Sequence, residues 1–382
     1  MDRRQFLIAT SWSALGVAAG TGRAFAETNG EPLKVGVLVP LSGPGAEFGG
    51  QERQAFEAVF EKINAAGGVG GKPVRVIVKD SKANPTEAAR LANQLILDDG
   101  VVAITTGTGA DTMAVADIVA RARVPLFFMG STFAATDPKA QYYPWVFRTC
   151  TTATDDAVLI RDRVVKEGHK RLAIFFSEDA FGQQSTELAE RITREKNDIG
   201  IVLKTSAALN ATDLTAPALA VRRSDADAVM IFSGAGVNAA GGFLRKLREL
   251  GSKIPAYGPA ALAQPALVRA AGDAAEGMTL AAIFNADEPG LLQPLFDVLK
   301  DHGGARGFGS LLGAASAATI AEGLKAGAKD GPSLRDAMEK LPPFSPYTAG
   351  KVQYAPNKHD GWGPQNLLIV RVKNGKFTNL DP

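Results

Sequence analysis

The sequence predicts an α/β protein that contains two parallel β-sheets, each with helices on both faces. Three observations support this prediction. Apolar runs of about seven residues suit parallel strands that are buried on both faces, amphipathic helical segments alternate with these runs, and a second series of the same kind follows the first. Strict alternation of strand and helix is typical of doubly wound sheets. We therefore expect two α/β halves in succession along the chain.

The first series of elements occupies residues 33–130. Leu33–Val39 is apolar along nearly its whole length, as expected for a buried strand. The helix that follows places Ala55, Val59 and Ile63 on one face and ends at glycines. Further strands are expected at 74–80, 101–106 and 124–130, and further helices at 85–100 and 111–123.

The second series begins near residue 154 and has the same organisation as the first. Strands are expected at 171–177, 201–207, 226–232, 254–258 and 277–284, with helices near 154–167, 182–196, 213–223, 236–250 and 264–271. A third group follows, with helices at 291–303, 309–327 and 333–341 and two late strands at 350–355 and 365–372. This tail predicts helices that cross back to complete the first half.

The N-terminus has the features of an export signal. Arg3 and Arg4 precede an apolar run, which ends at the small-residue pattern Ala24-Phe25-Ala26. The run is too short and too polar to span a membrane. We expect residues 1–26 to be a signal peptide that is cleaved near Ala26, and the mature protein to be periplasmic. The arginine pair resembles a twin-arginine signal, but Asp2 stands where Ser or Thr is usual, so Sec export stays open.

Composition excludes several classes of protein. The 382 residues suffice for two domains, and 46% hydrophobic with 21% charged residues is ordinary for a globular chain. A net charge of +2 is too small to indicate a nucleic-acid partner. Cys150 is the single cysteine, so a disulfide scaffold is excluded and stability must come from core packing.

Catalytic and metal-binding motifs are absent from the sequence. His169, His302 and His359 each fall near a predicted helix end or in a loop, where we expect solvated surface residues. There is no HExxH, no CxxC and no phosphate loop of the GxxxxGK[ST] type. Ser131 lacks the GxSxG context of a hydrolase nucleophile. The sequence therefore predicts a protein that is not an enzyme and has no metal or cofactor.

The segment "ITTGTGAD", residues 104–111, is the strongest candidate for a binding loop. It follows a predicted strand and precedes a predicted helix, but Asp111 and Thr112 stand where a dinucleotide fingerprint has its third glycine. Backbone N–H groups of Gly109–Thr112 at the helix start, with the Thr108 hydroxyl, suit a small anion or polar group. The alternative is that Asp111 only caps the helix.

Two segments carry a family resemblance. "LKVGVLVPLSGPGAEFGGQERQAFEAVFEKINAAGGVGGKPVRVIVKDSKANPTEAARLANQLI" and "AGDAAEGM" (271–278) resemble the branched-chain amino-acid type of periplasmic binding proteins, the Leu/Ile/Val-binding proteins of ABC importers. The resemblance implies the type I periplasmic-binding fold, with two lobes that are joined by three crossovers and close on a ligand. It implies lobe I at 31–150 and 284–360, and lobe II at 151–283 and 361–382. It also implies a monomer that works with a membrane permease and an ATPase.

The resemblance assigns ligand-binding positions to this sequence. The ligand carboxylate is expected at Gly109–Asp111 and at Thr132, with the Gly130 carbonyl as an acceptor. Phe48 matches a wall aromatic, and Phe181 stands at the usual tyrosine position of lobe II. The expected ligand-binding residues are Phe48, Thr108, Gly109, Ala110, Asp111, Gly130, Ser131, Thr132, Phe181, Gly236 and Ala260.

One departure from the family pattern affects the expected ligand. Amino-acid binders pair the ligand ammonium with an acid of lobe II, but the aligned residue here is Ala260, and Phe181 replaces a polar tyrosine. A buried ammonium without a countercharge costs several kcal/mol. We therefore expect a ligand with a carboxylate or amide head and an apolar or aromatic body. Amino acids stay open, because Asp111 or Asn238 can serve an ammonium. A ligand sensor of the same fold and an exported enzyme are the alternative functions.

Overall fold

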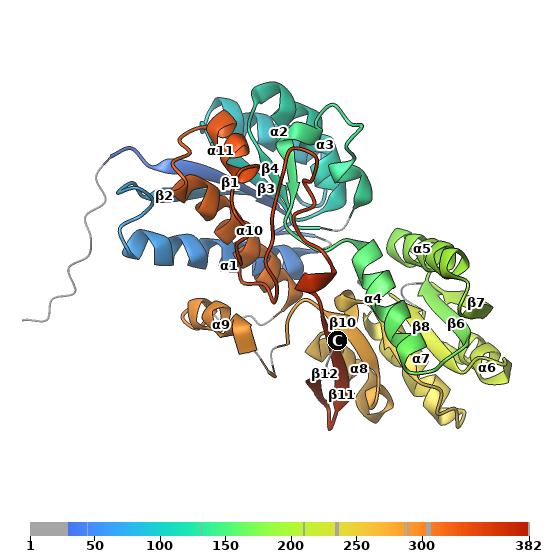
Figure 1. Ribbon diagram of the computed structural model, residues 1–382. Helices are drawn as coiled ribbons and strands as arrows, with labels where there is room; N and C mark the ends of the chain where they lie inside the picture. The colour runs from blue at the N-terminus through green and yellow to red at the C-terminus, as the bar shows by residue number, and fades with distance from the viewer. Residues whose placement is uncertain are drawn as a thin grey trace, which may run out of the picture.

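The computed structural model describes residues 30–43, 45–130, 132–208, 211–233, 237–285, 287–288, 290–302 and 307–380. These residues form two α/β lobes, each built around its own sheet (Figure 1). The expected signal peptide, residues 1–26, lies outside the described residues. None of the described helices is long and apolar enough to cross a membrane.

A five-stranded parallel sheet forms the centre of lobe I. Its strands lie in the order β2-β1-β3-β4-β5. Val35 of β1 pairs with Val76 of β2 on one side and with Ala103 of β3 on the other. Burial of β1 and β3 on both faces explains their continuous apolar sequences. The strands are β1 (Leu33–Val39), β2 (Val74–Asp80), β3 (Ala103–Thr106), β4 (Leu126–Phe128) and β5 (Val146–Arg148).

Helices from the beginning and the end of the chain cover this sheet. Close packing of α10 against α1 requires Gly313, because a Cβ there would collide with the Glu52 carbonyl. Asn84 caps α2 by accepting from the amides of Thr86 and Glu87. The helices are α1 (Ala46–Ala65), α2 (Pro85–Leu97), α3 (Gly109–Ala122), α9 (Gln293–Leu299), α10 (Phe308–Lys325) and α11 (Gly331–Met338). The C-terminal helices thus complete lobe I, as the sequence predicted.

A seven-stranded sheet in the order β12-β11-β10-β9-β8-β6-β7 forms the centre of lobe II. The strands from β10 to β7 run parallel, while β11 is antiparallel to both β10 and β12. Phe175 of β6 and Phe243 of α7 stack at 4.0 Å in its core. The strands are β6 (Arg171–Ser177), β7 (Gly200–Ala207), β8 (Ala228–Phe232), β9 (Ala256–Gly258), β10 (Thr279–Ala282), β11 (Leu368–Lys373) and β12 (Lys376–Leu380). The helices are α4 (Ala153–Lys166), α5 (Ala180–Lys196), α6 (Thr215–Arg223), α7 (Val237–Glu249) and α8 (Pro265–Ala271).

The chain passes between the lobes three times: between β5 and α4, between β10 and α9, and between residue 360 and β11. The third passage runs beside β5, where the Arg148 amide donates to the His359 carbonyl at 2.9 Å. The three passages agree with the expected architecture. The lobe boundaries given above stay a prediction.

One predicted strand is absent, two observed strands were not predicted, and one predicted surface residue is buried. Residues 350–355 form no strand, and this segment has only isolated bridges from Val352 to Phe344 and from Ala355 to Lys358. Two short strands, β5 and β12, were not predicted. His359 is buried, with 1% of its surface exposed, so the prediction of a solvated surface residue is wrong for it.

Candidate ligand-binding cleft

A cavity of about 530 Å³ lies between the two lobes. Loops that follow strands of both sheets line it, which is the usual place for ligands in parallel α/β sheets. Its lining residues are Gly45, Phe48, Gly107, Gly109, Phe128, Met129, Gly130, Thr132, Cys150, Thr151, Ala153, Asp156, Phe181, Ala261, Gln264 and Phe308. No lysine or arginine is among them.

Four phenylalanines give this cavity an aromatic wall. Phe48 of α1 and Phe308 of α10 stack with ring centroids 5.9 Å apart and an interplanar angle of 29°. Phe128 ends β4, and Phe181 is the second residue of α5. Asp179 caps α5 by accepting from the Gly182 amide at 2.9 Å, and this cap fixes the first turn that carries Phe181. Aromatic side chains from both lobes thus line one space.

The start of α3 contributes the main-chain donors of lobe I. Thr108 caps the helix, because its Oγ1 accepts from the Asp111 amide at 3.1 Å. Asp111 is therefore not the cap, contrary to the alternative that the sequence suggested. The Thr112 amide donates to the Thr108 carbonyl at 3.0 Å. Only the amides of Gly109 and Ala110 stay without an acceptor among the described residues, fewer than the four expected.

Thr132 lies against this helix start. A Cβ on Gly109 would collide with Thr132 Oγ1, so the glycine permits close approach of the hydroxyl to the N-terminus of α3. Both residues line the cavity. The hydroxyl and the free amides therefore gather at one point, which is also the positive end of a 14-residue helix.

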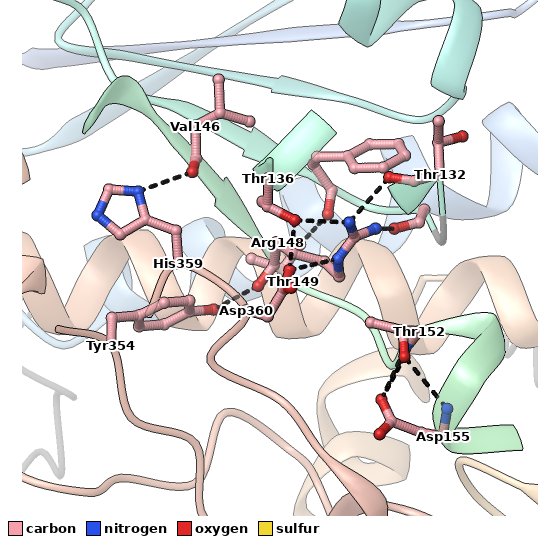
Figure 2. Close-up of polar contacts among 12 residues, drawn as sticks. Thr132, Thr136, Val146, Arg148, Thr149, Thr152, Asp155, Tyr354, His359 and Asp360 are labelled. Atoms are coloured by element: carbon pink, nitrogen blue, oxygen red, sulfur yellow. Dashed lines mark hydrogen bonds and ion pairs between the residues drawn. The ribbon is translucent and has the colours of Figure 1, made fainter. Parts of the chain in front are cut away.

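Arg148 holds the loop that carries Thr132 in place (Figure 2). Its guanidinium is fully buried. Nη1 donates to the Gly130 carbonyl at 2.7 Å, and Nη2 donates to the Thr132 carbonyl at 2.8 Å and to Thr136 Oγ1 at 2.7 Å. Nε forms an ion pair with Asp360 Oδ1 at 2.6 Å. The Gly130 carbonyl, expected to accept from the ligand, thus accepts from Arg148.

The main chain around Arg148 is fixed from the side of the third passage (Figure 2). The Tyr354 hydroxyl donates to the Arg148 carbonyl at 2.7 Å. His359 lies between the rings of Tyr143 and Phe147, at 4.4 and 4.1 Å, and its Nδ1 is 2.9 Å from the Val146 carbonyl. Burial lowers the pKa of His359. The segment that contains Tyr354 and His359 therefore fixes the main chain of β5 next to the site.

Two buried acids lie behind the 107–109 loop. Asp111 accepts from Ser81 Oγ at 2.7 Å through Oδ2, and its Oδ1 has no hydrogen-bond partner among the described residues. Glu52 is fully buried, and a Cβ on Gly107 would collide with its carboxyl group. Burial raises the pKa of Glu52 well above its usual range, and Asp111 raises it further. Neither acid lines the cavity.

The structure places the other expected site residues as follows. Phe48, Gly109, Gly130, Thr132 and Phe181 line the cavity together. Thr108 is the cap described above, Ala110 is exposed, and Ala260 is buried and does not line the cavity. Ser131 and Gly236 lie outside the described residues. The roles of all these residues in ligand binding stay predictions.

Sequence reasoning missed Asp156, Phe308 and Gln264 of the cavity, and Arg148 beneath it. Asp156 Oδ2 accepts from the Ala260 amide at 3.3 Å. An acid is therefore present next to the position where the sequence suggested that lobe II had none. The sequence feature that could have indicated this acid is the pair Asp155-Asp156 in the first turn of α4, directly after the first passage between the lobes.

A second hollow, of about 680 Å³, opens beside the cavity. Thr132 and Ala153 line both spaces, so the hollow adjoins the cavity. Its other lining residues come from both lobes and include Asp137, Gln184 and Arg191. No group of three or more His, Cys, Asp or Glu side chains is placed to hold a metal ion in the part of the chain that the structure describes.

Two α/β lobes with an aromatic cavity between the ends of their strands define a two-lobed ligand-binding protein. The sequence model of the family described as "Periplasmic binding protein" matches residues 32–376. The chain belongs to this family of solute-binding proteins, and the resemblance noted in the sequence is confirmed.

Individual relatives are consistent with this assignment. The Leu, Ile, Val, Thr and Ala-binding protein of Pseudomonas aeruginosa is 26% identical over 314 residues, 81% of this chain and 82% of its own. An ABC-transporter solute-binding protein of Rhodopseudomonas palustris BisB5, solved with 3,4-dihydroxybenzoic acid, is 28% identical, with a TM-score of 0.76 over 91% of this chain and 96% of its own. A branched-chain amino acid ABC transporter protein of Thermus thermophilus, solved with valine, has a TM-score of 0.79 at 19% identity, over 92% of this chain and 96% of its own. At that identity the last comparison concerns the fold alone.

Proposed function

We propose that this chain is the periplasmic substrate-binding protein of an ABC importer, and that it binds a small aromatic carboxylic acid in the cavity between its lobes. The observation that carries this proposal is the combination of four phenylalanines with a cluster of neutral hydrogen-bond donors at the start of α3. The phenylalanines would contact the ring of an aromatic acid, and the donors would bind its carboxylate.

The carboxylate binds at Gly109, Ala110 and Thr132. Two free main-chain amides and one hydroxyl donate to its oxygens, and the helix end adds a favourable electrostatic potential. No lysine or arginine lines the cavity, so these neutral donors take the place of the water that the carboxylate loses. The arrangement therefore suits a singly charged acid.

The aromatic body of the ligand lies against Phe48 and Phe308 on one side and Phe181 on the other. A cavity of about 530 Å³ has room for a substituted benzene ring and several waters. The Rhodopseudomonas palustris protein, which is 28% identical, binds 3,4-dihydroxybenzoic acid and supports this ligand class.

Binding works by closure of the lobes and involves no chemical step. A ligand that touches both walls interacts fully only when the lobes are closed, so it shifts the population toward the closed state. We expect a permease to recognise the closed surface, and its ATPase to drive uptake. A signal peptide at residues 1–26 would bring the protein to the periplasm, where a monomer suffices. A ligand sensor of the same fold would use the same closure.

A branched-chain amino acid is the second candidate ligand. The Asp156 carboxylate in the lobe II wall favours it, because an ionised carboxylate can pair with an ammonium. Curated relatives that bind leucine, isoleucine and valine point the same way.

Calorimetric titration of the purified protein distinguishes the two candidates. The panel contains benzoate, 4-hydroxybenzoate, 3,4-dihydroxybenzoate, leucine, valine and the keto acid of leucine. We expect at least one aromatic acid to bind at micromolar or lower Kd and to raise Tm, with much weaker binding of leucine and valine. Thr132→Val should weaken every carboxylate that binds. Tight binding of leucine without binding of any aromatic or keto acid would contradict the proposal.

A further inference from the structure

Asp156 is the one acidic side chain that lines the cavity. It is the fourth residue of α4, whose first turn is fixed by a capping box between Thr152 and Asp155. Figure 2 shows this first turn, with the bonds from Thr152 to Asp155. The position of Asp156 is therefore set by a rigid helix end on the lobe II side of the cleft.

Only one of the two carboxyl oxygens of Asp156 has a hydrogen-bond partner among the described residues. Oδ2 accepts from the Ala260 amide at 3.3 Å, whereas Oδ1 is shielded from solvent and has no hydrogen-bond partner among the described residues. No salt bridge joins Asp156 to any described cation. Leaving a buried carboxyl oxygen unpaired is unfavourable, so such atoms in native proteins usually meet a ligand or an ordered water.

The surroundings of Asp156 allow a neutral hydrogen-bond partner. Its charged and titratable neighbours are Asp155 on the same helix and the buried thiol of Cys150. Burial raises the pKa of Asp156 to about 7, the Ala260 amide lowers it and Asp155 raises it. Near pH 7 the carboxyl group is therefore close to half protonated, and it can either accept or donate a hydrogen bond.

The two polar sites of the cavity come from different lobes. Gly109 and Thr132 belong to lobe I, Asp156 belongs to lobe II, and phenylalanine side chains from both lobes line the space with them. A ligand that contacts both polar sites and the phenylalanines has an aromatic ring with polar groups at two separate positions.

The geometry points to Asp156 as the specificity-determining residue of lobe II, which hydrogen-bonds through Oδ1 to a hydroxyl group on the ligand ring, remote from the ligand carboxylate. This inference rests on the proposed function, since it needs an aromatic acid in the cavity. The favoured ligand class is then a benzoic acid with a hydroxyl group in the meta or para position, in preference to benzoate itself.

Titration of three proteins with four acids tests the inference. The ligands are benzoate, 3-hydroxybenzoate, 4-hydroxybenzoate and 3,4-dihydroxybenzoate, and the proteins are wild type, Asp156→Ala and Asp156→Asn. We expect wild type to bind the best hydroxylated acid about tenfold to a hundredfold more tightly than benzoate, which is the effect of one hydrogen bond to a buried group. Asp156→Ala should reduce this ratio to near one while benzoate affinity changes little. In Asp156→Asn the amide oxygen can accept from the Ala260 amide while the side-chain NH2 donates to the ligand hydroxyl oxygen, so a several-fold preference should remain.

The ratio separates a role in recognition from a structural role, because a general loosening of the cleft would weaken all four acids alike. Glu195→Gln, on the exposed face of α5 in lobe II, is the matched control and should leave the ratio unchanged. Circular dichroism and Tm verify that each variant is folded.

Three results would overturn the inference. Benzoate can bind wild type as tightly as every hydroxylated acid, or the preference can survive in Asp156→Ala. In either case aromatic acids still bind, so the proposed function stands while the role of Asp156 fails. The third result is that leucine binds, no aromatic acid does, and Asp156→Ala abolishes leucine binding. That result refutes the proposed function as well, and assigns Asp156 to an ammonium.

Discussion

Arg148 and Asp360 form an ion pair, with Nε and Oδ1 2.6 Å apart, that joins the last strand of lobe I to the third passage between the lobes. The guanidinium is completely buried and also donates to the Gly130 carbonyl, the Thr132 carbonyl and Thr136 Oγ1. Thr132 carries the hydroxyl that we assign to the ligand carboxylate. The ion pair therefore links the closing segment of the chain to the geometry of the binding site.

Arg148→Met should destabilise the protein strongly. The substitution removes the cation that pairs with Asp360 and the donor to the Gly130 carbonyl. Asp360 is one-third exposed and still accepts from Thr136, so we expect a cost near the lower end of the about 3–5 kcal/mol that is typical for a broken buried ion pair. Urea unfolding at pH 7 measures the change in free energy of unfolding. The control is Lys325→Met, which removes an exposed i,i+3 pair with Glu322 on α10 and should cost less than about 1 kcal/mol. Equal losses in the two variants would contradict the structural role of Arg148.

Gly109→Ala should reduce ligand affinity with little effect on the fold. A Cβ at this position meets Thr132 Oγ1, so the hydroxyl must move away from the free amides of α3. We expect the Kd for the carboxylate ligand to rise at least tenfold by calorimetry. Gly50→Ala in α1 is the control, since its Cβ meets nothing within 4 Å. That variant should keep wild-type affinity and gain up to about 1 kcal/mol from helix propensity.

The fold was predictable from sequence because its signals are local. The buried strands of both lobes are continuous apolar runs, and the helices between them have one apolar face, so pattern alone located most elements. The failures also have a local cause. Residues 350–355 have the alternating pattern of a strand, but pattern does not reveal whether a partner strand is available. The β5 strand has only three residues, which is too short for any periodicity to appear.

The site was less predictable because its support comes from residues far apart in the chain. Arg148 lies 212 positions from Asp360, and nothing in either local sequence indicates the pair. His359 looked like a surface residue among Lys, Asp and Gly, yet two aromatic rings enclose it. The sequence did not indicate Asp156, because the family pattern places the acid of lobe II in the loop at Ala260. Its carboxyl group reaches that loop from a different helix.

Glu52→Gln should stabilise the protein increasingly as pH rises. Burial raises the pKa of Glu52 well above its usual value of 4.5, so the native state keeps a proton that the unfolded state releases above that pH. The unfolded state then binds fewer protons, and this residue's contribution to stability falls as pH rises toward its folded pKa, by up to about 1.4 kcal/mol per pH unit. A neutral glutamine removes this dependence.

Urea unfolding at pH 5, 6, 7 and 8 tests this expectation. The stability of Glu52→Gln relative to wild type should increase steadily over the series, whereas Glu195→Gln, which changes an exposed acid, should show no such trend. A difference between Glu52→Gln and wild type that stays constant with pH would show that Glu52 is ionised in the folded protein.

Cys150 should resist alkylation in the native protein. Burial and the nearby Asp156 raise the pKa of its thiol to about 12, so only about one molecule in ten thousand carries the reactive thiolate at pH 8. Mass spectrometry after incubation with iodoacetamide should show an unmodified protein, and full modification in urea. Rapid native labelling would show that the cavity wall opens readily to solvent.

Phe308→Leu should weaken aromatic ligands selectively. The Phe308 ring stacks on Phe48 at 5.9 Å and lines the cavity, so it offers a face or an edge to a ligand ring. Aromatic pairs contribute about 0.5–1.5 kcal/mol beyond the area that they bury, which corresponds to a loss of about twofold to tenfold in affinity. A leucine side chain at position 308 retains much of the apolar contact area, so the affinity for an aliphatic acid should fall less. Calorimetry with 4-hydroxybenzoate and with the keto acid of leucine supplies both measurements on one variant. Equal losses for the two acids would mean that Phe308 acts through packing of α10 alone, and that the aromatic wall does not recognise the ring of the ligand.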